Sequence, residues 1–187
     1  IISANRFIPS KNLLTLIDAF ACSVSNNRES WDLVLLGAGE QESVLRQRAV
    51  DHGLQNRVLF PGFCTYTEIP RWYAAAEIFV HPARTEQWGL VVNEAMAARL
   101  PIILSNTCGC HPDLLEEGKN GLSFFPENTD LLSQHLSTLM DDPKLRHEMG
   151  QRSRDLIVEQ FSPAKFGGGL CEAVQAAITG RKRTPAM

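Results

Sequence analysis

The sequence has neither a long apolar run nor the glycine loop of dinucleotide-binding enzymes. No apolar stretch approaches the roughly 20 residues that a membrane-spanning helix needs, and the first residues lack the charged and apolar regions of a signal peptide. No glycine precedes Gly37, so no G-x-G-x-x-G loop follows the first apolar segment. These absences predict a chain that neither spans a membrane nor is secreted, and they argue against NAD as a ligand.

The sequence also has little excess charge and no metal-binding spacing. The net charge is −3 over 187 residues, and the cationic cluster at 181–183 falls in an expected tail, so no nucleic-acid-binding surface is predicted. The five cysteines form no C-x-x-C pair and the five histidines no i, i+4 pair, so we expect no metal cofactor. We interpret the cysteines as reduced thiols of a cytoplasmic protein.

What is present is the composition and periodicity of one α/β domain, with 44% hydrophobic and 21% charged residues. Short apolar runs predict strands at residues 1–3, 32–36, 58–60, 78–81, 102–105 and 121–124. Segments of helical period predict helices at residues 13–23, 42–52, 67–75, 90–98, 112–116, 129–140, 143–159 and 163–179. The alternation predicts a Rossmann-like, doubly wound parallel sheet with a helical C-terminal end, and the glycines at 167–169 predict a bend in the last helix.

Two cations flank the loop after the first predicted strand. Arg6 and Lys11 lie five residues apart, ahead of a predicted helix whose N-terminal N–H groups and dipole attract anions. In doubly wound sheets, ligands lie outside the carboxyl ends of the strands. The two side chains are therefore candidates to hold a diphosphate, with solvated surface charges as the alternative.

A pair of glycines follows the second predicted strand. Gly37 and Gly39 let the backbone turn sharply or approach a ligand closely. An ordinary strand-to-helix turn explains the same pattern. We retain Gly39 as a candidate ligand contact and leave that alternative open.

The segment after the fourth predicted strand carries two carboxylates beside a helix start. Glu86 lies in the loop and Glu94 inside the helix, with seven residues between them. The N–H groups of Gly89, Leu90 and Val91 have no acceptor within the first turn and favour an anion. Because carboxylates accept hydrogen bonds from hydroxyl groups, the arrangement favours a sugar nucleotide. Taken singly, each glutamate is also explained as an acid near a helix start.

Four aromatic and histidine residues near these segments are assigned either to the core or to the surroundings of the ligand. Trp72 and Tyr73 are expected in the core rather than as a platform for sugar stacking. His81, at the end of a strand, and His111, in the turn after the fifth strand, are the two histidines expected within reach of a ligand.

Over nearly its whole length, the chain resembles the C-terminal domain of the retaining GT-B-fold glycosyltransferases of family 4, also called group 1. The most specific segment is E-Q-W-G-L-V-V-N-E-A-M-A-A-R-L-P, which is similar to the family's E-x7-E motif. R-F-I-P-S-K-N resembles its phosphate-binding segment. V-L-F-P-G-F and W-Y-A-A-A-E-I-F-V-H-P-A resemble its third and fourth strand regions.

The resemblance implies a role for each candidate residue. Arg6 and Lys11 would hold the donor diphosphate and stabilise it as it leaves. Glu94 would bond to the ribose hydroxyls, and Glu86 would address the transferred sugar. Backbone groups complete the implied donor site, with those of Phe63 and Cys64 facing the base and those of Gly89, Leu90 and Val91 facing the phosphate or the sugar.

Three departures from the family pattern surround these residues. Asn5 stands where the family has glycine before Arg6, and Trp88 stands where it has phenylalanine before Gly89. At 108–113, Cys-Gly-Cys-His-Pro-Asp replaces a Gly-Gly-x-x-Glu turn. This third change predicts an altered sugar end of the pocket, or only an altered turn.

The resemblance implies transfer of a hexose from a nucleoside diphosphate sugar to a saccharide or lipid-linked acceptor, with retention and without an obligatory metal. We expect residues 1–180 to be the donor-binding domain of a parent enzyme, inactive alone, with 181–187 as a tail. The acceptor site would belong to an absent N-terminal domain, and the parent enzyme could lie peripherally at the inner membrane face. The alternatives are a GT-B sugar-nucleotide epimerase or sugar-phosphate synthase, and a non-catalytic nucleotide-sugar-binding module.

Overall fold

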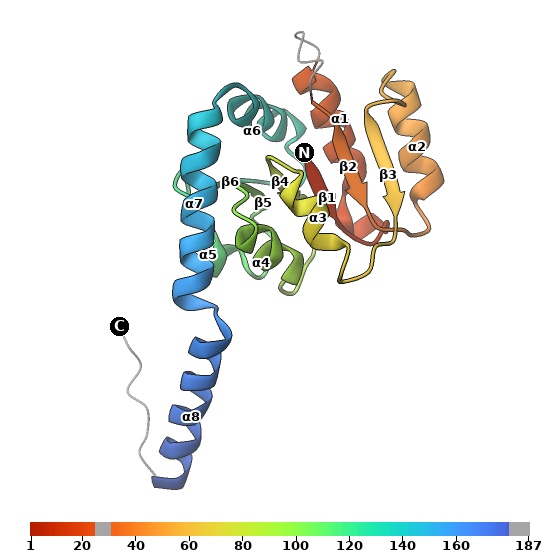
Figure 1. Ribbon diagram of the computed structural model, residues 1–187. Helices are drawn as coiled ribbons and strands as arrows, with labels where there is room; N and C mark the ends of the chain where they lie inside the picture. Colours follow the sequence, from red (N-terminus) through yellow and green to blue (C-terminus); the bar gives the residue numbers. More distant parts are fainter. Residues whose placement is uncertain (25–30, 180–187) are drawn as a thin grey trace.

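One parallel sheet forms the centre of the molecule (Figure 1). The computed structural model describes residues 1–24 and 31–179, so the cationic cluster at 181–183 and the predicted tail lie outside the described residues. The strands are β1 (Ile2–Ala4), β2 (Leu33–Leu36), β3 (Val58–Gly62), β4 (Phe79–His81), β5 (Ile102–Ser105) and β6 (Gly121–Phe124). Their order across the sheet is β3-β2-β1-β4-β5-β6, and each predicted strand is present.

The central strands are short apolar runs because both of their faces are covered. All residues of β1, β4 and β5 are buried. Parallel sheets need such two-sided cover because their crossover helices pack on both faces. The strands therefore show continuous apolar character rather than alternation, which is the signal that predicted them.

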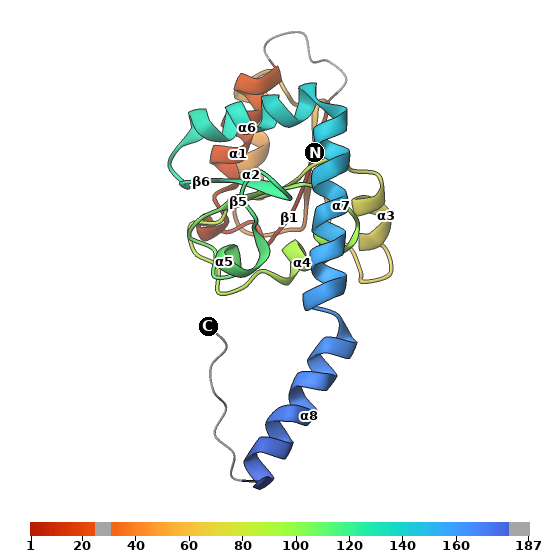
Figure 2. The same ribbon diagram turned by 90° about the vertical axis from the view of Figure 1, so that its left-hand side faces the viewer.

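Helices form a layer on each face of the sheet, as Figures 1 and 2 show. One layer contains α1 (Leu13–Val24), α2 (Glu42–Asp51) and α6 (Thr129–Asp141). The other contains α3 (Ile69–Ala74), α4 (Leu90–Ala97), α5 (His111–Leu114) and the main part of α7 (Pro143–Gln160). Each layer closes its own apolar core against the sheet, so the predicted doubly wound architecture is confirmed.

The last helix, α8 (Pro163–Thr179), extends away from the sheet (Figure 2). The predicted bend at the glycines 167–169 is wrong, because these residues lie inside the helix. The chain changes direction at Phe161 and Ser162, between α7 and α8. Pro163 explains this position, because a proline disfavours helical geometry in the residue before it. A helical glycine only weakens the helix, by about 1 kcal/mol.

The strand order reverses between β1 and β4, and this brings two distant loops together. β1 pairs with β2 on one side and with β4 on the other. Ser3 donates a hydrogen bond to the carbonyl oxygen of Val80 at 2.7 Å, which joins the two strands through a side chain as well. The loops that leave β1 and β4 therefore start next to each other, at the position where doubly wound sheets bind ligands.

The glycine pair after β2 packs directly on the loop that leaves β1. Gly37 has φ +134°, and a Cβ atom there would lie 1.9 Å from the carbonyl oxygen of Asn5. A Cβ atom on Gly39 would lie 2.6 Å from the carbonyl oxygen of Phe7. Backbone contact with the loop carrying Arg6 thus accounts for both glycines as packing residues.

We predict that Gly37→Ala destabilises the fold far more than Gly53→Ala. Both positions have positive φ, yet a Cβ on Gly53 meets nothing within 4 Å. Gly53→Ala should cost about 1 kcal/mol, from the backbone conformation alone, and Gly37→Ala roughly 3 kcal/mol, because it adds a backbone clash. Urea unfolding measures both values, and equal losses would show that the contact with Asn5 does not constrain this turn.

Candidate functional site

A pocket of about 410 Å³ opens at the carboxyl ends of β1 and β4. Seven of the predicted site residues line it, namely Arg6, Lys11, Glu86, Gly89, Leu90, Val91 and Glu94. Asn5, Tyr66 and Trp88 also line the pocket. A larger hollow of about 560 Å³ lies by Ile1 and Arg146 at the opposite edge of the sheet, and none of the predicted site residues lines it. The chemistry-bearing side chains gather in the smaller pocket.

Three predicted residues lie outside the lining of this pocket. Gly39 packs on the backbone of Phe7. Phe63 and Cys64 directly follow β3, and the Phe63 side chain is 81% exposed. All three lie beyond the carboxyl ends of β2 and β3, so they border the same edge of the sheet as the pocket without closing it.

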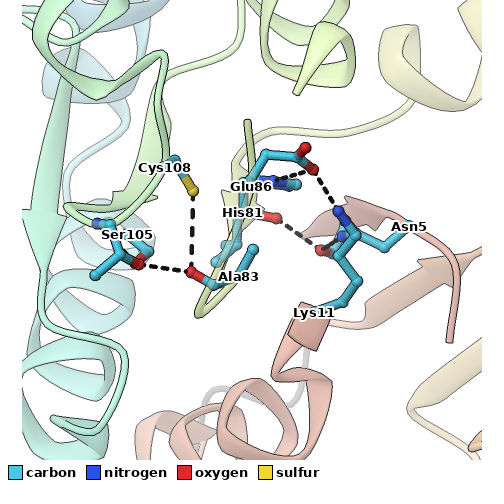
Figure 3. Close-up of polar contacts among 10 residues, drawn as sticks. Asn5, Lys11, His81, Ala83, Glu86, Ser105 and Cys108 are labelled. Atoms are coloured by element: carbon cyan, nitrogen blue, oxygen red, sulfur yellow. Dashed lines mark hydrogen bonds and ion pairs between the residues drawn. The ribbon is translucent and has the colours of Figure 1, made fainter. Parts of the chain in front are cut away.

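Lys11 and Glu86 meet in the pocket and form an ion pair (Figure 3). Lys11 ends a short 3-10 helix, Pro9–Lys11, and the next residue, Asn12, is buried and left-handed. The Asn12 side-chain amide donates to the carbonyl oxygen of Pro126 at 2.8 Å and so anchors this turn. The Lys11 and Glu86 side chains are only 12% and 19% exposed. The two loops after β1 and β4 are therefore joined by opposite charges that lie largely out of water.

His81 lies beneath this ion pair, at the end of β4 (Figure 3). Its ring is fully buried, and burial lowers the pKa of the imidazole, which is therefore neutral at neutral pH. Its Nε2 lies 3.5 Å from Oε2 of Glu86. The His81 ring and the Lys11 ammonium together lower the pKa of the Glu86 carboxyl to about 2. Because the imidazole is neutral, Lys11 supplies the charge that balances Glu86.

The Glu94 carboxylate accepts a hydrogen bond from Tyr73, a residue that the sequence predicted only as part of the core. The hydroxyl of Tyr73, in α3, donates to Oε2 of Glu94 at 3.2 Å. Tyr73 is buried, as predicted, and burial together with the nearby carboxylate raises the pKa of its phenol. The hydroxyl therefore stays protonated and orients Glu94. Helical spacing placed Tyr73 inward, but nothing in the sequence linked it to a glutamate on another helix.

The first turn of α4 presents backbone N–H groups to the pocket. Gly89 caps the helix with φ +89°, a left-handed conformation that favours glycine. The N–H groups of Gly89, Leu90 and Val91 have no acceptor inside the helix. Trp88 donates from Nε1 to the Asn93 side chain at 2.9 Å, which fixes the chain as it enters α4. The turn can accept an anion from the pocket.

Cys108 and Cys110 lie buried in the turn after β5. Burial raises the pKa of Cys108 to about 12 and that of Cys110 to about 11. Both remain thiols at neutral pH, so neither is a nucleophile. Cys64, Cys108, Cys110 and Cys171 are free thiols.

The fold is a Rossmann-like lobe of the GT-B type. Residues 1–156 match the family described as "Glycosyl transferases group 1". The chain belongs to this family, and the resemblance seen in its E-x7-E segment is confirmed.

Curated relatives are sugar transferases of about twice the length. A GDP-mannose-dependent monoacylated alpha-(1-6)-phosphatidylinositol monomannoside mannosyltransferase of Corynebacterium glutamicum is 33% identical over 179 residues, which cover 92% of this chain and 46% of the relative. An alpha-D-kanosaminyltransferase of Streptomyces kanamyceticus is 27% identical over 170 residues, covering 91% of this chain and 44% of the relative. The chain thus spans less than half the length of these relatives.

Solved structures show the same fold. HepE of Anabaena, in complex with UDP, superimposes with a TM-score of 0.84 at 24% identity, covering 94% of this chain and 48% of that one. The C-terminal domain of a group 1 glycosyl transferase, LpcC, from Francisella tularensis has a TM-score of 0.79 at 27% identity. That match covers 87% of this chain and 86% of the other.

In the described part of the chain, no helix combines the length and apolarity that a membrane crossing requires. Within residues 1–24 and 31–179, no group of three or more His, Cys, Asp or Glu side chains is arranged to hold a metal ion.

The lowered pKa of Glu86 predicts a pH-dependent stability difference between the native chain and Glu86→Gln. The folded-state pKa, about 2, lies below the ordinary value of 4.5, so ionised Glu86 stabilises the fold above pH 4.5. This contribution is lost as the pH falls through about 2. Urea unfolding across this range should show the native chain as the more stable one above pH 4.5, and the difference should shrink on acidification. A difference that does not change with pH would contradict the pairing.

Proposed function

We propose that this chain is the donor-binding lobe of a retaining hexosyltransferase that uses a nucleoside diphosphate sugar. One observation carries the proposal: a single pocket gathers two cations, the free N–H groups of a helix start and two carboxylates. A sugar nucleotide presents the complementary groups, a diphosphate flanked by a hydroxylated ribose on one side and a hydroxylated hexose on the other. The UDP complex of HepE, which shares the fold, supports this choice.

In the proposed complex, Arg6 and Lys11 hold the diphosphate with the N–H groups of Gly89, Leu90 and Val91. Glu94, oriented by Tyr73, accepts hydrogen bonds from the ribose hydroxyls. The apolar hollow beside Glu94, about 400 Å³ and lined by Tyr66 and Ile69, accommodates the base. Backbone groups of Gly39, Phe63 and Cys64 are proposed as further donor contacts at this edge of the sheet.

Glu86 is proposed to contact the transferred hexose. Negative charge grows on the diphosphate as the glycosidic bond breaks, and pre-placed cations and N–H donors stabilise that state more than the ground state. Arg6, Lys11 and the α4 amides supply these groups, so we propose that no metal ion is obligatory. Glu86 orients the sugar and favours its developing positive charge. A hydroxyl of the acceptor, a saccharide or a lipid-linked one, then attacks the anomeric carbon from the face that the diphosphate leaves and passes its proton to the departing diphosphate oxygen, which retains the anomeric configuration.

The proposal includes a second lobe that carries the acceptor site, in a parent enzyme located in the cytoplasm or at the inner membrane face. The coverage of less than half of the relatives supports it. α8 supports it as well: none of its residues is buried, and it exposes apolar side chains one helical turn apart, at Phe166, Leu170, Val174 and Ile178. A stripe of this kind normally lies against another surface.

The binding test is a calorimetric titration of this chain with UDP, GDP and ADP and with their glucose or mannose conjugates. We predict that one nucleotide series binds, and that Arg6→Ala and Glu94→Ala each weaken it about ten-fold through lost charge-assisted hydrogen bonds. Arg48→Ala on α2 and Glu148→Ala on α7 are matched controls, because both side chains are exposed and lie outside the pocket lining. A nucleotide affinity that is unchanged in Arg6→Ala and Glu94→Ala would contradict the proposed site.

We predict no hexose transfer by this chain alone, because one open lobe leaves the reacting groups in water. The full-length enzyme should convert the sugar nucleotide that binds best into a glycoside that keeps the anomeric configuration of the donor. NMR of the anomeric proton checks this, and an inverted glycoside would contradict the retaining mechanism. Turnover by the single lobe would contradict its inactivity. Epimerised sugar nucleotide or a sugar phosphate ester would favour the other enzyme classes, and donor binding without any product would favour a binding module.

A further inference from the structure

The turn after β5, residues 105–110, holds the backbone of Glu86 without lining the pocket. Glu86 and Cys108 form a parallel β-bridge outside the sheet. The N–H of Gly109 donates to the carbonyl oxygen of Glu86 at 2.8 Å. The residue that carries the pocket carboxylate is thus fixed by a segment from the next strand along the sheet.

The same turn fixes the start of the loop that carries Glu86. The hydroxyl of Thr107 donates to the carbonyl oxygen of Ala83 at 3.0 Å, and Figure 3 shows the thiol of Cys108 directed to the same oxygen. Ser105 bonds to the Thr107 hydroxyl at 2.8 Å and steadies it. The segment between Ala83 and Glu86 is therefore tied to the turn at both of its ends.

The close packing of the turn on the backbone of the Glu86 loop requires a glycine at position 109. A Cβ atom on Gly109 would lie 1.9 Å from the carbonyl oxygen of Gln87 and 3.4 Å from that of Glu86. No flexible side chain is available to move aside, because both neighbours are main-chain atoms. The turn and the Glu86 loop can approach this closely only because residue 109 has no side chain.

We propose that the turn at residues 105–110 positions Glu86 against Lys11 and thereby sets how strongly the site prefers a sugar nucleotide over the free nucleotide. The second part rests on the proposed function. The turn acts through Glu86 and is a positioning element, since none of its residues lines the pocket. A misplacement of about 1 Å is enough to weaken an oriented polar contact, and here it would affect the contact to the sugar.

Thr107→Val tests the proposal with little change of side-chain shape, because it removes the hydroxyl that donates a hydrogen bond to the carbonyl oxygen of Ala83. We expect it to weaken UDP-glucose or GDP-mannose, whichever the native chain binds, about five-fold, the effect of one hydrogen bond. The affinity for the matching UDP or GDP should change less than about two-fold. Thr107→Ser keeps the hydroxyl and should restore the native ratio. Thr138→Val is the matched control, because its exposed hydroxyl bonds to a carbonyl oxygen within α6.

A second pair of variants tests whether the close approach of Gly109 to the Glu86 loop is needed for the positioning. Gly109→Ala should give a larger loss of sugar-nucleotide preference than Thr107→Val, because the added carbon displaces the loop directly. Gly167→Ala is its control, since a Cβ there meets nothing within 4 Å. Thermal melting of each variant identifies any that fails to fold, and Thr107→Val then carries the test.

A readout without ligand separates this proposal from the proposed function. Carbon NMR of the Glu86 carboxyl should give a pKa near 2 in the native chain. In Thr107→Val the pKa should rise toward 4.5, because the carboxylate is held less closely beside His81 and Lys11. If no nucleotide binds the native chain, the proposed function fails while this shift still tests the positioning. Unchanged Glu86 pKa and unchanged binding ratio in folded Thr107→Val overturn the proposal, and an equal loss of nucleotide and sugar nucleotide overturns its selectivity.

Discussion

The ion pair between Lys11 and Glu86 connects the two halves of the doubly wound sheet. Lys11 comes from the loop after β1, and Glu86 from the loop after β4. These strands are neighbours only because the strand order reverses between them, and Ser3 fixes them together through Val80. Two charges that lie largely out of water need each other, because a buried charge without a partner is strongly destabilising. The pair therefore joins the two loops in the pocket, which residues of α4 and Tyr66 also line.

Each pocket carboxylate is oriented by groups that do not line the pocket. Glu94 receives the hydroxyl of Tyr73 from α3. Glu86 lies over the neutral ring of His81, and its backbone is held by Gly109. Support from a rigid strand or helix behind the pocket reduces the freedom of a side chain before a ligand arrives, which is how polar sites gain precision.

The sequence predicted the parts of this structure that depend on local periodicity. Strands such as β5 are continuous apolar runs because both of their faces are buried. The spacing of Glu86, Gly89 and Glu94 indicates a loop that leads into a helix. Contacts between distant segments left no such trace. The bond from Tyr73 to Glu94 and the bridge from Glu86 to Cys108 depend on which strands become neighbours, and spacing along the chain does not encode that. The bend after α7 was misplaced because Pro163 decides it, not the glycines within α8.

The ion pair also affects how strongly the pocket would bind the diphosphate of the proposed donor. Lys11 already has an anionic partner, so a diphosphate adds a second anion to the same ammonium and meets repulsion from Glu86. A free nucleotide offers nothing in return, whereas the hydroxyl groups of a hexose can donate hydrogen bonds to the carboxylate and spread its charge. The site should therefore favour the complete donor over its nucleotide product because of the same carboxylate. In the proposed reaction, loss of the sugar would leave Glu86 facing the diphosphate without its hydroxyl partners, which would assist release of the product.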